Sequence, residues 1–308
     1  MRTRISVVTA CFNQVGFIEQ TIRSVLGQRY PNLQYIIIDG GSTDGTIDII
    51  NRYRDDIDAV ISERDDGQYY AIQKGLDIAD GDVVAWINAD DMYMPWTFSV
   101  VDSVFGEFPE VDWITGRPSY LNVAGQCTEV SETSSAYPQR WIAQGWYRSH
   151  LAGYLQQESM FWRRSLMQKV GHLELTLDYA ADFEFWTRFA ALAELTAVNV
   201  PLAAFRRRPG EQRSVDGTGR YENQVLQAAA KLGTAPWLWN WIGQQGVAFR
   251  AFWRLLKWRR GKVLTYSREQ SRWVLTNSLR PISRVSFSGL LLANHAARCG
   301  RQRDKYKN

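Results

Sequence analysis

Short apolar runs alternate with segments of helical periodicity through the first 115 residues. A continuous or β-branched apolar run predicts a strand, and apolar residues spaced three and four apart predict an amphipathic helix. We expect strands near residues 5–10, 33–38, 58–62, 82–87 and 111–115, and helices over 16–28, 43–54, 68–79 and 96–107. Because the strands are apolar on both faces and helices separate them, this pattern predicts an α/β fold with a Rossmann-like, mostly parallel sheet covered on both sides.

The chain after residue 116 is less regular. We expect extended pieces over 117–130, an aromatic-rich stretch over 137–154, a strand over 195–205, and helices near 163–170, 181–193 and about 219–232. Thr234-Ala-Pro236 marks a boundary. We therefore divide the chain into residues 1–115 and 116–234, as two halves of one domain, and a helical extension over 235–308.

The extension is strongly basic and rich in tryptophan. It holds fifteen Lys and Arg but only Glu269 and Asp304 as acids. Arg250, Arg254 and Lys257 fall on one helical face with aromatic residues around them, as in a helix at an anionic membrane interface. We expect residues 236–273 to contact such a surface, and packing of the tryptophans against the rest of the protein is the alternative. No recognisable nucleic-acid module accompanies the basic stretch, so nucleic acid is not an expected partner.

Composition narrows the class of protein. The 308 residues are 45% hydrophobic and include 13 Trp, 14 Tyr and 13 Phe, too many aromatic residues for a disordered chain. The sequence shows no secretory signal and no uninterrupted apolar run of about 20 residues that would span a membrane. The three cysteines are scattered, which excludes a disulfide scaffold and a structural zinc site. These features are typical of a cytoplasmic protein that could lie at the inner face of the plasma membrane. They leave the oligomeric state open.

Polar residues follow the first four predicted strands. Ligands bind beyond the carboxyl ends of the strands in such sheets. The chain has no glycine-rich phosphate loop, so another group must neutralise any bound diphosphate. Asp90 and Asp91 could do so through Mg²⁺ or Mn²⁺, since both ions prefer oxygen ligands. The alternative for these carboxylates is a helix N-cap. The polar residues at the strand ends are Thr9 and Asn13, Asp39, 63–66, and 88–91.

An ordered set of segments over about residues 4–215 resembles family 2 glycosyltransferases. The resemblance implies a GT-A fold and an inverting enzyme that uses a nucleotide-sugar donor, expected to be a UDP-sugar, and a glycan or lipid-linked acceptor. It also implies a divalent metal, Mn²⁺ or Mg²⁺. The matching segments are Ser6-Val-Val-Thr9 with Asn13, 38–46, 62–69 with Ala71 and Lys74-Gly75, Ile87-Asn-Ala-Asp-Asp91, 156–164, and 179–188.

The resemblance implies a role for each donor-side residue. Asp39 would accept a hydrogen bond from the base, supported by Thr9, although turn chemistry is the alternative for Asp39 and accounts for Asp44. Asp91 would bind the metal. The remaining expected donor contacts are Asn13, Asp66 at base or ribose, Lys74 at the phosphates, Asn88, and Asp90 at the ribose.

Asp182 matches the catalytic base of the family. It lies near the start of its expected helix, where the helix dipole favours the ionised form that a base requires, and a mere helix-start carboxylate is the alternative. Glu184 is about 200° further round and pairs with Arg188 instead. Gln157 and Glu158 are expected to shape the acceptor pocket. Trp186 would stack on an acceptor sugar, with core packing as its alternative.

One position departs from the family pattern. Many relatives carry a histidine after the strand equivalent to 200–206, whereas this chain has Arg206-Arg-Arg-Pro-Gly210. Arg208 could contact the diphosphate directly and replace a metal ligand. Two rival functions remain: a sugar-phosphate nucleotidyltransferase, which would need a glycine- and arginine-rich loop after the first strand, and a non-catalytic sugar-nucleotide-binding or glycan-binding protein.

Overall fold

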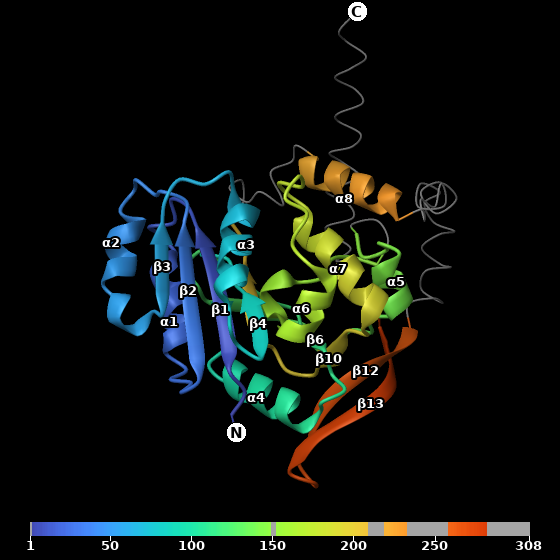
Figure 1. Ribbon diagram of the computed structural model, residues 1–308. Helices are drawn as coiled ribbons and strands as arrows, with labels where there is room; N and C mark the ends of the chain where they lie inside the picture. The colour runs from blue at the N-terminus through green and yellow to red at the C-terminus, as the bar shows by residue number, and fades with distance from the viewer. Residues whose placement is uncertain (1, 149–151, 209–218, 233–257, 282–308) are drawn as a thin grey trace, which may run out of the picture.

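A large mixed sheet organises the molecule (Figure 1). The computed structural model describes residues 2–148, 152–208, 219–232 and 258–281. Within them the sheet runs β13-β12-β10-β6-β9-β4-β1-β2-β3, and only β9 and β13 are antiparallel to their neighbours. This confirms the predicted α/β class. The strands are β1 (Ile5–Cys11), β2 (Leu33–Asp39), β3 (Ala59–Ser62), β4 (Val83–Trp86), β6 (Trp113–Thr115), β9 (Met160–Arg163), β10 (Thr196–Val198), β12 (Trp258–Ser267) and β13 (Arg272–Pro281).

Successive residues of the central strands pack into two different hydrophobic clusters. Val7 belongs to one cluster and Val8 to the other, as the period of two in a strand requires. All seven residues of β1 are buried. The uninterrupted apolar runs of the sequence therefore reflect a sheet that is covered on both faces.

Two groups of helices cover the two faces. The helices α1 (Ile18–Leu26), α2 (Thr46–Asn51) and α4 (Thr97–Glu107) contribute to the cluster of Val7. The helices α3 (Gln68–Ile78), α5 (Gln139–Ala143), α6 (Arg164–Val170), α7 (Ala181–Leu192) and α8 (Arg220–Lys231) contribute to the cluster of Val8. In α3, a Cβ on Gly75 would lie 2.3 Å from a Val8 methyl carbon. Glycine thus lets α3 pack directly on β1, which fixes the start of α3 at the edge of the sheet.

A smaller sheet lies beside the ends of the central strands. It runs β5-β11-β7-β8, with β11 antiparallel to β5 and parallel to β7. The segment predicted as one strand over 195–205 is two strands, β10 and β11, in two different sheets. The strands are β5 (Met92–Tyr93), β7 (Ser119–Leu121), β8 (Cys127–Val130) and β11 (Ala203–Arg206). This arrangement carries the Arg206–Arg208 segment to the turn that follows β4.

The basic C-terminal extension is not helical in its described part. Residues 258–281 form the hairpin β12–β13, which extends the central sheet through parallel pairing of β12 with β10. Val263 and Leu264 are fully buried on opposite faces, so the hairpin belongs to the core. The predicted amphipathic helix around Arg250–Lys257 lies outside the described residues. Among the described helices, none is long and apolar enough to cross a membrane.

Candidate active site

Asp39 ends β2 and organises the turn that follows it. Its carboxylate accepts hydrogen bonds from the backbone N–H groups of Gly41 and Ser42 at 3.2 and 3.0 Å, from Ser62 Oγ at 2.6 Å, and from Ser42 Oγ. Burial raises the pKa of Asp39, but these hydrogen bonds outweigh burial and lower it below its usual value. The side chain is fully buried. Contact between Asp39 and a base therefore stays a prediction, and it requires the turn to open.

The loops after β1 and β2 are joined by short polar side chains. Asn13, at φ 51°, accepts a hydrogen bond from the Thr43 N–H at 2.9 Å and donates its own N–H to Ser42 Oγ at 2.8 Å. Gly45 caps α2. The helix thus begins later than the expected residue 43, and the Ser42 hydroxyl is hydrogen-bonded to the Asn13 N–H and to Asp39 instead. Asn13 remains exposed at this edge.

Thr9 does not line an open site. It is fully buried, and its hydroxyl is 3.1 Å from the hydroxyl of Tyr35, which belongs to the hydrophobic core. The side chain has no exposed surface in this conformation. Support of the base pocket by Thr9 therefore stays a prediction.

Asp91 is held inside the turn that follows β4. Its Oδ1 accepts the Arg206 N–H at 2.8 Å, and its Oδ2 accepts the Asn88 amide at 3.1 Å. Burial, with the nearby Asp90 and Glu158, raises the pKa of Asp91 well above its usual value. The carboxylate is fully buried, and both of its oxygens accept hydrogen bonds. Metal binding by Asp91 therefore stays a prediction, and it requires these contacts to open.

Asp90 is the carboxylate of this turn that retains some exposure. Its Oδ2 lies 2.7 Å from Arg208 Nη2, and both side chains are 14% exposed. The Arg208 guanidinium also lies over the Phe17 ring, 4.7 Å from its centroid. Arg208 thus reaches the acidic turn, as its place after the β11 strand predicts.

Arg206 is a residue that the sequence reasoning missed. Its side chain is fully buried, donates to Val123 O at 2.8 Å and Gln20 Oε1 at 2.9 Å, and also binds Asp90 O. Through its N–H it also holds Asp91. Arg206 therefore ties β11, α1 and the β7–β8 turn to the acidic turn. The run of three arginines offered no signal as to which one is buried.

The other donor-side residues lie on three segments, with Asp66 in the loop after β3, Lys74 in α3 and Asn88 in the turn after β4. Asp66 is exposed, and Lys74 forms an ion pair with Glu63. Asn88 Oδ1 accepts the Gln68 amide at 2.8 Å, which joins the start of α3 to the acidic turn. These residues follow the same edge of the sheet, and their contacts with a donor stay predictions.

Asp182 lies in the first turn of α7 and faces α3. Its Oδ1 accepts a hydrogen bond from the Tyr69 hydroxyl at 3.0 Å, which also donates to Tyr179 O at 3.2 Å. Burial raises the pKa of Asp182 to about 6, and the hydrogen bonds from Tyr69 and the Phe183 N–H limit that rise. Near neutral pH the carboxylate is thus ionised and only weakly solvated, as a base must be.

Glu184 has a separate role, as its helical position predicts. It binds Arg188 through two hydrogen bonds of 2.8 and 2.7 Å. The guanidinium is held further by the carbonyl oxygens of Val170 and His172 at 2.8 Å. Glu184 is therefore engaged between α7 and the end of α6, away from Asp182.

Glu158 is a buried acid near the turn that follows β4. It belongs to the 3₁₀ turn η2 (Gln157–Ser159), which contacts β4, β5 and β11. The side chain is 2% exposed, and its Oε1 has no hydrogen-bond partner among the described residues. Burial raises the pKa of Glu158 to about 8, and the negative charges of Asp90 and Asp182 add to the rise. Both carboxylates thus act electrostatically on Glu158.

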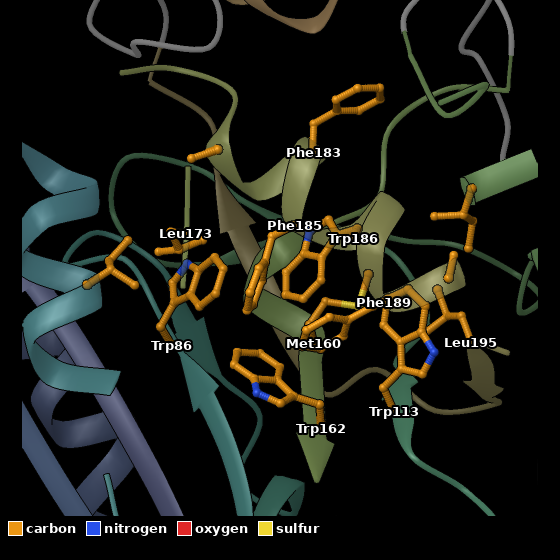
Figure 2. Close-up of a cluster of buried hydrophobic side chains, with 14 of the residues drawn as sticks. Trp86, Trp113, Met160, Trp162, Leu173, Phe183, Phe185, Trp186, Phe189 and Leu195 are labelled. Carbon is orange, nitrogen blue, oxygen red and sulfur yellow. The ribbon is translucent and has the colours of Figure 1, made fainter. Parts of the chain in front are cut away.

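Gln157 and Trp186 both contact Trp86, the last residue of β4. Gln157 donates to Trp86 O at 2.6 Å. Trp186 stacks on Trp86, with ring centroids 5.2 Å apart and an interplanar angle of 13°, within the cluster of Figure 2. Trp186 is 2% exposed and belongs to the hydrophobic cluster, which confirms core packing, whereas its contact with an acceptor sugar stays a prediction. Trp186 still lines a small cavity together with Asp182.

The side chains that could bind a metal ion here suit an ion that substrate phosphates would also bind. Among the described residues, no group of three or more His, Cys, Asp and Glu side chains could hold a metal. Asp90 offers one carboxylate, and Mg²⁺ is commonly bound by one or two carboxylates plus substrate phosphates. The residues therefore fit a metal that enters with a diphosphate and competes with Arg208 for Asp90.

Comparison with known proteins identifies the class. The family model described as "Glycosyl transferase family 2" matches residues 6–166, more than half of the chain. The chain belongs to glycosyl transferase family 2 and is a glycosyltransferase enzyme. It is 27% identical over 207 residues to the uncharacterized glycosyltransferase Rv1514c of Mycobacterium tuberculosis, covering 65% of this chain and 74% of the relative. It is 39% identical over 92 residues to the putative teichuronic acid biosynthesis glycosyltransferase TuaG of Bacillus subtilis, covering 29% of this chain and 36% of TuaG.

Solved structures share the GT-A fold. Residues 1–349 of S. aureus TarS in complex with UDP-GlcNAc match with a TM-score of 0.56 and 19% identity, over 74% of this chain and 66% of that one. The mannosyltransferase PcManGT from Pyrobaculum calidifontis, in complex with GDP-Man and Mn²⁺, matches with a TM-score of 0.53 and 19% identity, over 75% and 64%. The chain covers 39% of the longer TarS chain that also matches. The predicted fold and family are thus confirmed.

Proposed function

We propose that this protein is an inverting glycosyltransferase that moves a sugar from a nucleotide donor to a hydroxyl group of the acceptor, with Asp182 as the general base. The observation that carries the proposal is the start of α3. Gln68 donates a hydrogen bond to Asn88 in the acidic turn, and the next residue, Tyr69, donates one to Asp182, which supports a single site that includes the donor-side turn and the proposed base.

The reaction needs one proton acceptor and one leaving-group site. The acceptor oxygen forms a bond to the anomeric carbon of the donor sugar while the bond from that carbon to the diphosphate oxygen breaks. Asp182 takes the hydroxyl proton, and the nucleoside diphosphate leaves with the bonding electrons. Attack from the side opposite to the leaving group inverts the configuration of the anomeric carbon.

The donor is proposed to be a UDP-sugar, with contacts from Asn13, Asp39, Asp66, Lys74 and Asn88. Neighbours of the same fold were solved with UDP-GlcNAc and with GDP-Man, which supports a nucleotide sugar. The acceptor is proposed to be a glycan or a lipid-linked sugar, in keeping with the biosynthetic name of TuaG.

Asp90 and Arg208 would hold the diphosphate end of the donor. A divalent ion, Mn²⁺ or Mg²⁺, would bind Asp90 and the phosphates and stabilise the leaving group. Arg208 supplies a positive charge for the same oxygens from the chain itself. Asp90 thus replaces Asp91 as the proposed metal ligand, because its carboxylate keeps exposed surface.

A nucleotide screen tests the proposed function. UDP, GDP, CDP and TDP, and their common sugar conjugates, are added with and without Mn²⁺, and the melting temperature is measured. We expect UDP to raise it, and more so with Mn²⁺. NMR of the product formed from the donor identified in this way reports the anomeric configuration. Retention of configuration, or no response to any nucleotide, would contradict the proposal.

We further propose that residues 236–273 attach the protein to an anionic membrane surface. In the described part, Arg260 on β12 is exposed and adds one positive charge, whereas Arg259 lies over the Trp141 ring and Lys262 pairs with Glu194. Deletion of 236–308 would remove two strands of the central sheet, so the test uses the triple variant Arg250→Glu, Arg254→Glu, Lys257→Glu in the full chain. We expect the unaltered protein to sediment with vesicles rich in phosphatidylglycerol and the variant to stay in solution. Equal sedimentation would contradict this proposal.

A further inference from the structure

A pair of tyrosines, Tyr154 and Tyr221, lies close to the cavity that Asp182 lines. Tyr154 is 48% exposed, and its ring centroid is 5.8 Å from that of Tyr221 at an interplanar angle of 63°. The Tyr154 hydroxyl donates to Glu222 Oε1 at 2.6 Å. The contacts with Glu222 and Tyr221 thus hold the Tyr154 ring in place. The exposed part of this ring stays accessible to solvent.

Tyr221 connects this pair with Asp182. Tyr221 and Leu155, the residue after Tyr154, line the small cavity that Asp182 also lines. The negative charge of Asp182 acts on the Tyr221 hydroxyl, as do the neighbouring Tyr69 and Tyr154. Tyr221 therefore contacts the exposed ring of Tyr154 and also lines the cavity of Asp182, the proposed base.

An unsatisfied hydrogen-bond donor borders the same cavity. Trp186 lines it, and the indole Nε1 of this 2% exposed residue has no partner among the described residues. Buried N–H groups nearly always find an acceptor in native structures. A hydroxyl group of a bound molecule, or a water that it retains, would satisfy this donor next to Asp182.

We propose that Tyr154, braced by Tyr221, is the platform on which the acceptor sugar ring stacks, with the attacking hydroxyl directed towards Asp182. This inference rests on the proposed function and specifies its acceptor as a glycosyl residue. The C–H face of a pyranose packs well on an aromatic face, and tyrosine provides that area at little cost in side-chain entropy.

The charges around the platform favour a sugar over a lipid chain. Glu222 at the platform edge offers carboxylate oxygens that sugar hydroxyls can share with the Tyr154 hydroxyl. The Glu222 charge also acts on the guanidinium of Arg148, which is 5% exposed. A prenyl or acyl chain would have to desolvate the Glu222 carboxylate without hydrogen-bonding to it.

The test measures acceptor and donor steps separately in the full chain. Methyl glycosides of the common hexoses are used as acceptors, since they carry no aromatic or lipid group, and a short polyprenyl phosphate is used in a parallel arm. The variants are Tyr154→Ala, which removes the ring, and Tyr154→Phe, which keeps it. The matched control is Tyr266→Ala, because Tyr266 is 49% exposed and packs edge-on to Trp273 at 5.6 Å on the β12–β13 hairpin.

We expect Tyr154→Ala to raise the KM for the methyl glycoside about tenfold while hydrolysis of the donor by water is unchanged. Tyr154→Phe and Tyr266→Ala should each stay within about twofold of the unaltered protein. Saturation-transfer NMR should show glycoside binding weakened about tenfold in Tyr154→Ala and unchanged in Tyr266→Ala.

Three results would overturn the inference. The first is an unchanged glycoside KM in Tyr154→Ala. The second is an equal loss in Tyr266→Ala, and the third is use of the polyprenyl phosphate alone with no effect of Tyr154→Ala. Failure of the unaltered chain to bind or hydrolyse any nucleotide sugar is a different result, because it contradicts the proposed function itself.

Discussion

Arg208 binds Asp90 at 2.7 Å, across the gap between the segment after β11 and the turn after β4. Both side chains are 14% exposed, so the pair is shielded from water but can be reached by a ligand. The Arg208 guanidinium therefore already pairs with the Asp90 carboxylate that a metal ion would use. The donor diphosphate would therefore meet a positive charge even before a metal enters.

Replacing this arginine should separate the two sources of positive charge. We expect Arg208→Gln to weaken UDP binding without metal at least tenfold, because a charge-assisted hydrogen bond contributes roughly 1.5–3 kcal/mol. Mn²⁺ should restore more affinity in the variant than in the unaltered protein, since Asp90 is then released. Calorimetric titration of UDP with and without Mn²⁺ measures both effects.

The neighbouring Arg207 provides the control for this experiment. Arg207 pairs with Glu129, and its side chain is 50% exposed. Arg207→Gln should leave UDP binding unchanged. Equal metal-free affinities of Arg208→Gln and the unaltered protein would show that Arg208 does not contact the diphosphate.

The pH dependence of kcat/KM should show whether the Tyr69 hydroxyl lowers the pKa of Asp182. A base must be ionised, so kcat/KM should fall below the Asp182 pKa of about 6. The Tyr69 hydroxyl stabilises the ionised form, and its loss raises the pKa. Tyr69→Phe should therefore move the acid limb of the pH–rate profile to higher pH and leave the plateau within a few-fold. A limb that stays in place, or moves equally in the exposed neighbour variant Tyr70→Phe, contradicts this role.

Because of Glu158, the free energy of unfolding should fall as the pH rises. Its pKa of about 8 exceeds the usual value of 4.5, so the folded state binds one more proton than the unfolded state between these pH values. The free energy of unfolding then falls by roughly 1.4 kcal/mol per pH unit over this range. Glu158→Gln removes the dependence, so its advantage in urea unfolding should grow from pH 5 to pH 8. The exposed Glu129→Gln should show no such trend, and a constant difference for Glu158→Gln would count against a buried neutral acid.

The C-terminal hairpin should behave as part of the core. Leu264 is fully buried on β12, so Leu264→Ala should lower the free energy of unfolding by about 2–5 kcal/mol. Arg268→Ala, in the exposed turn between β12 and β13, should cost under about 0.5 kcal/mol. Urea unfolding followed by tryptophan fluorescence measures both. A small effect of Leu264→Ala would indicate that the hairpin is not integrated into the sheet.

Local pattern was sufficient to predict the first half of the fold. The strands that end at Asp39 and at Trp86 are long apolar runs with helical segments between them, and tertiary structure reinforces that local preference. The position of Asp182 at the start of α7 and the separate pairing of Glu184 also followed from helical geometry. The C-terminal hairpin did not, because Val263 and Leu264 form a buried strand only through pairing with β10, a contact distant in sequence.

The roles of the individual site residues depend on which of their side chains are buried, and the sequence does not reveal this. Asp90 and Asp91 are adjacent and chemically identical, yet the Arg206 N–H draws one into the core and leaves the other beside Arg208. Thr9 and Trp186 lie on strand and helix faces that turn into the hydrophobic clusters. A motif marks the segment that forms the site, whereas packing decides which side chain of the segment meets the ligand.

The most direct measurement compares Asp182→Asn with Glu184→Gln, two substitutions on the same turn of α7. For each variant, the Kd for UDP and the turnover with donor and acceptor are determined. We expect Asp182→Asn to retain UDP affinity within about twofold and to lose 10²- to 10⁴-fold in kcat, the usual contribution of a general base. Glu184→Gln should keep kcat within a few-fold. Full turnover by Asp182→Asn would contradict the assignment of the base and, with it, the proposed mechanism.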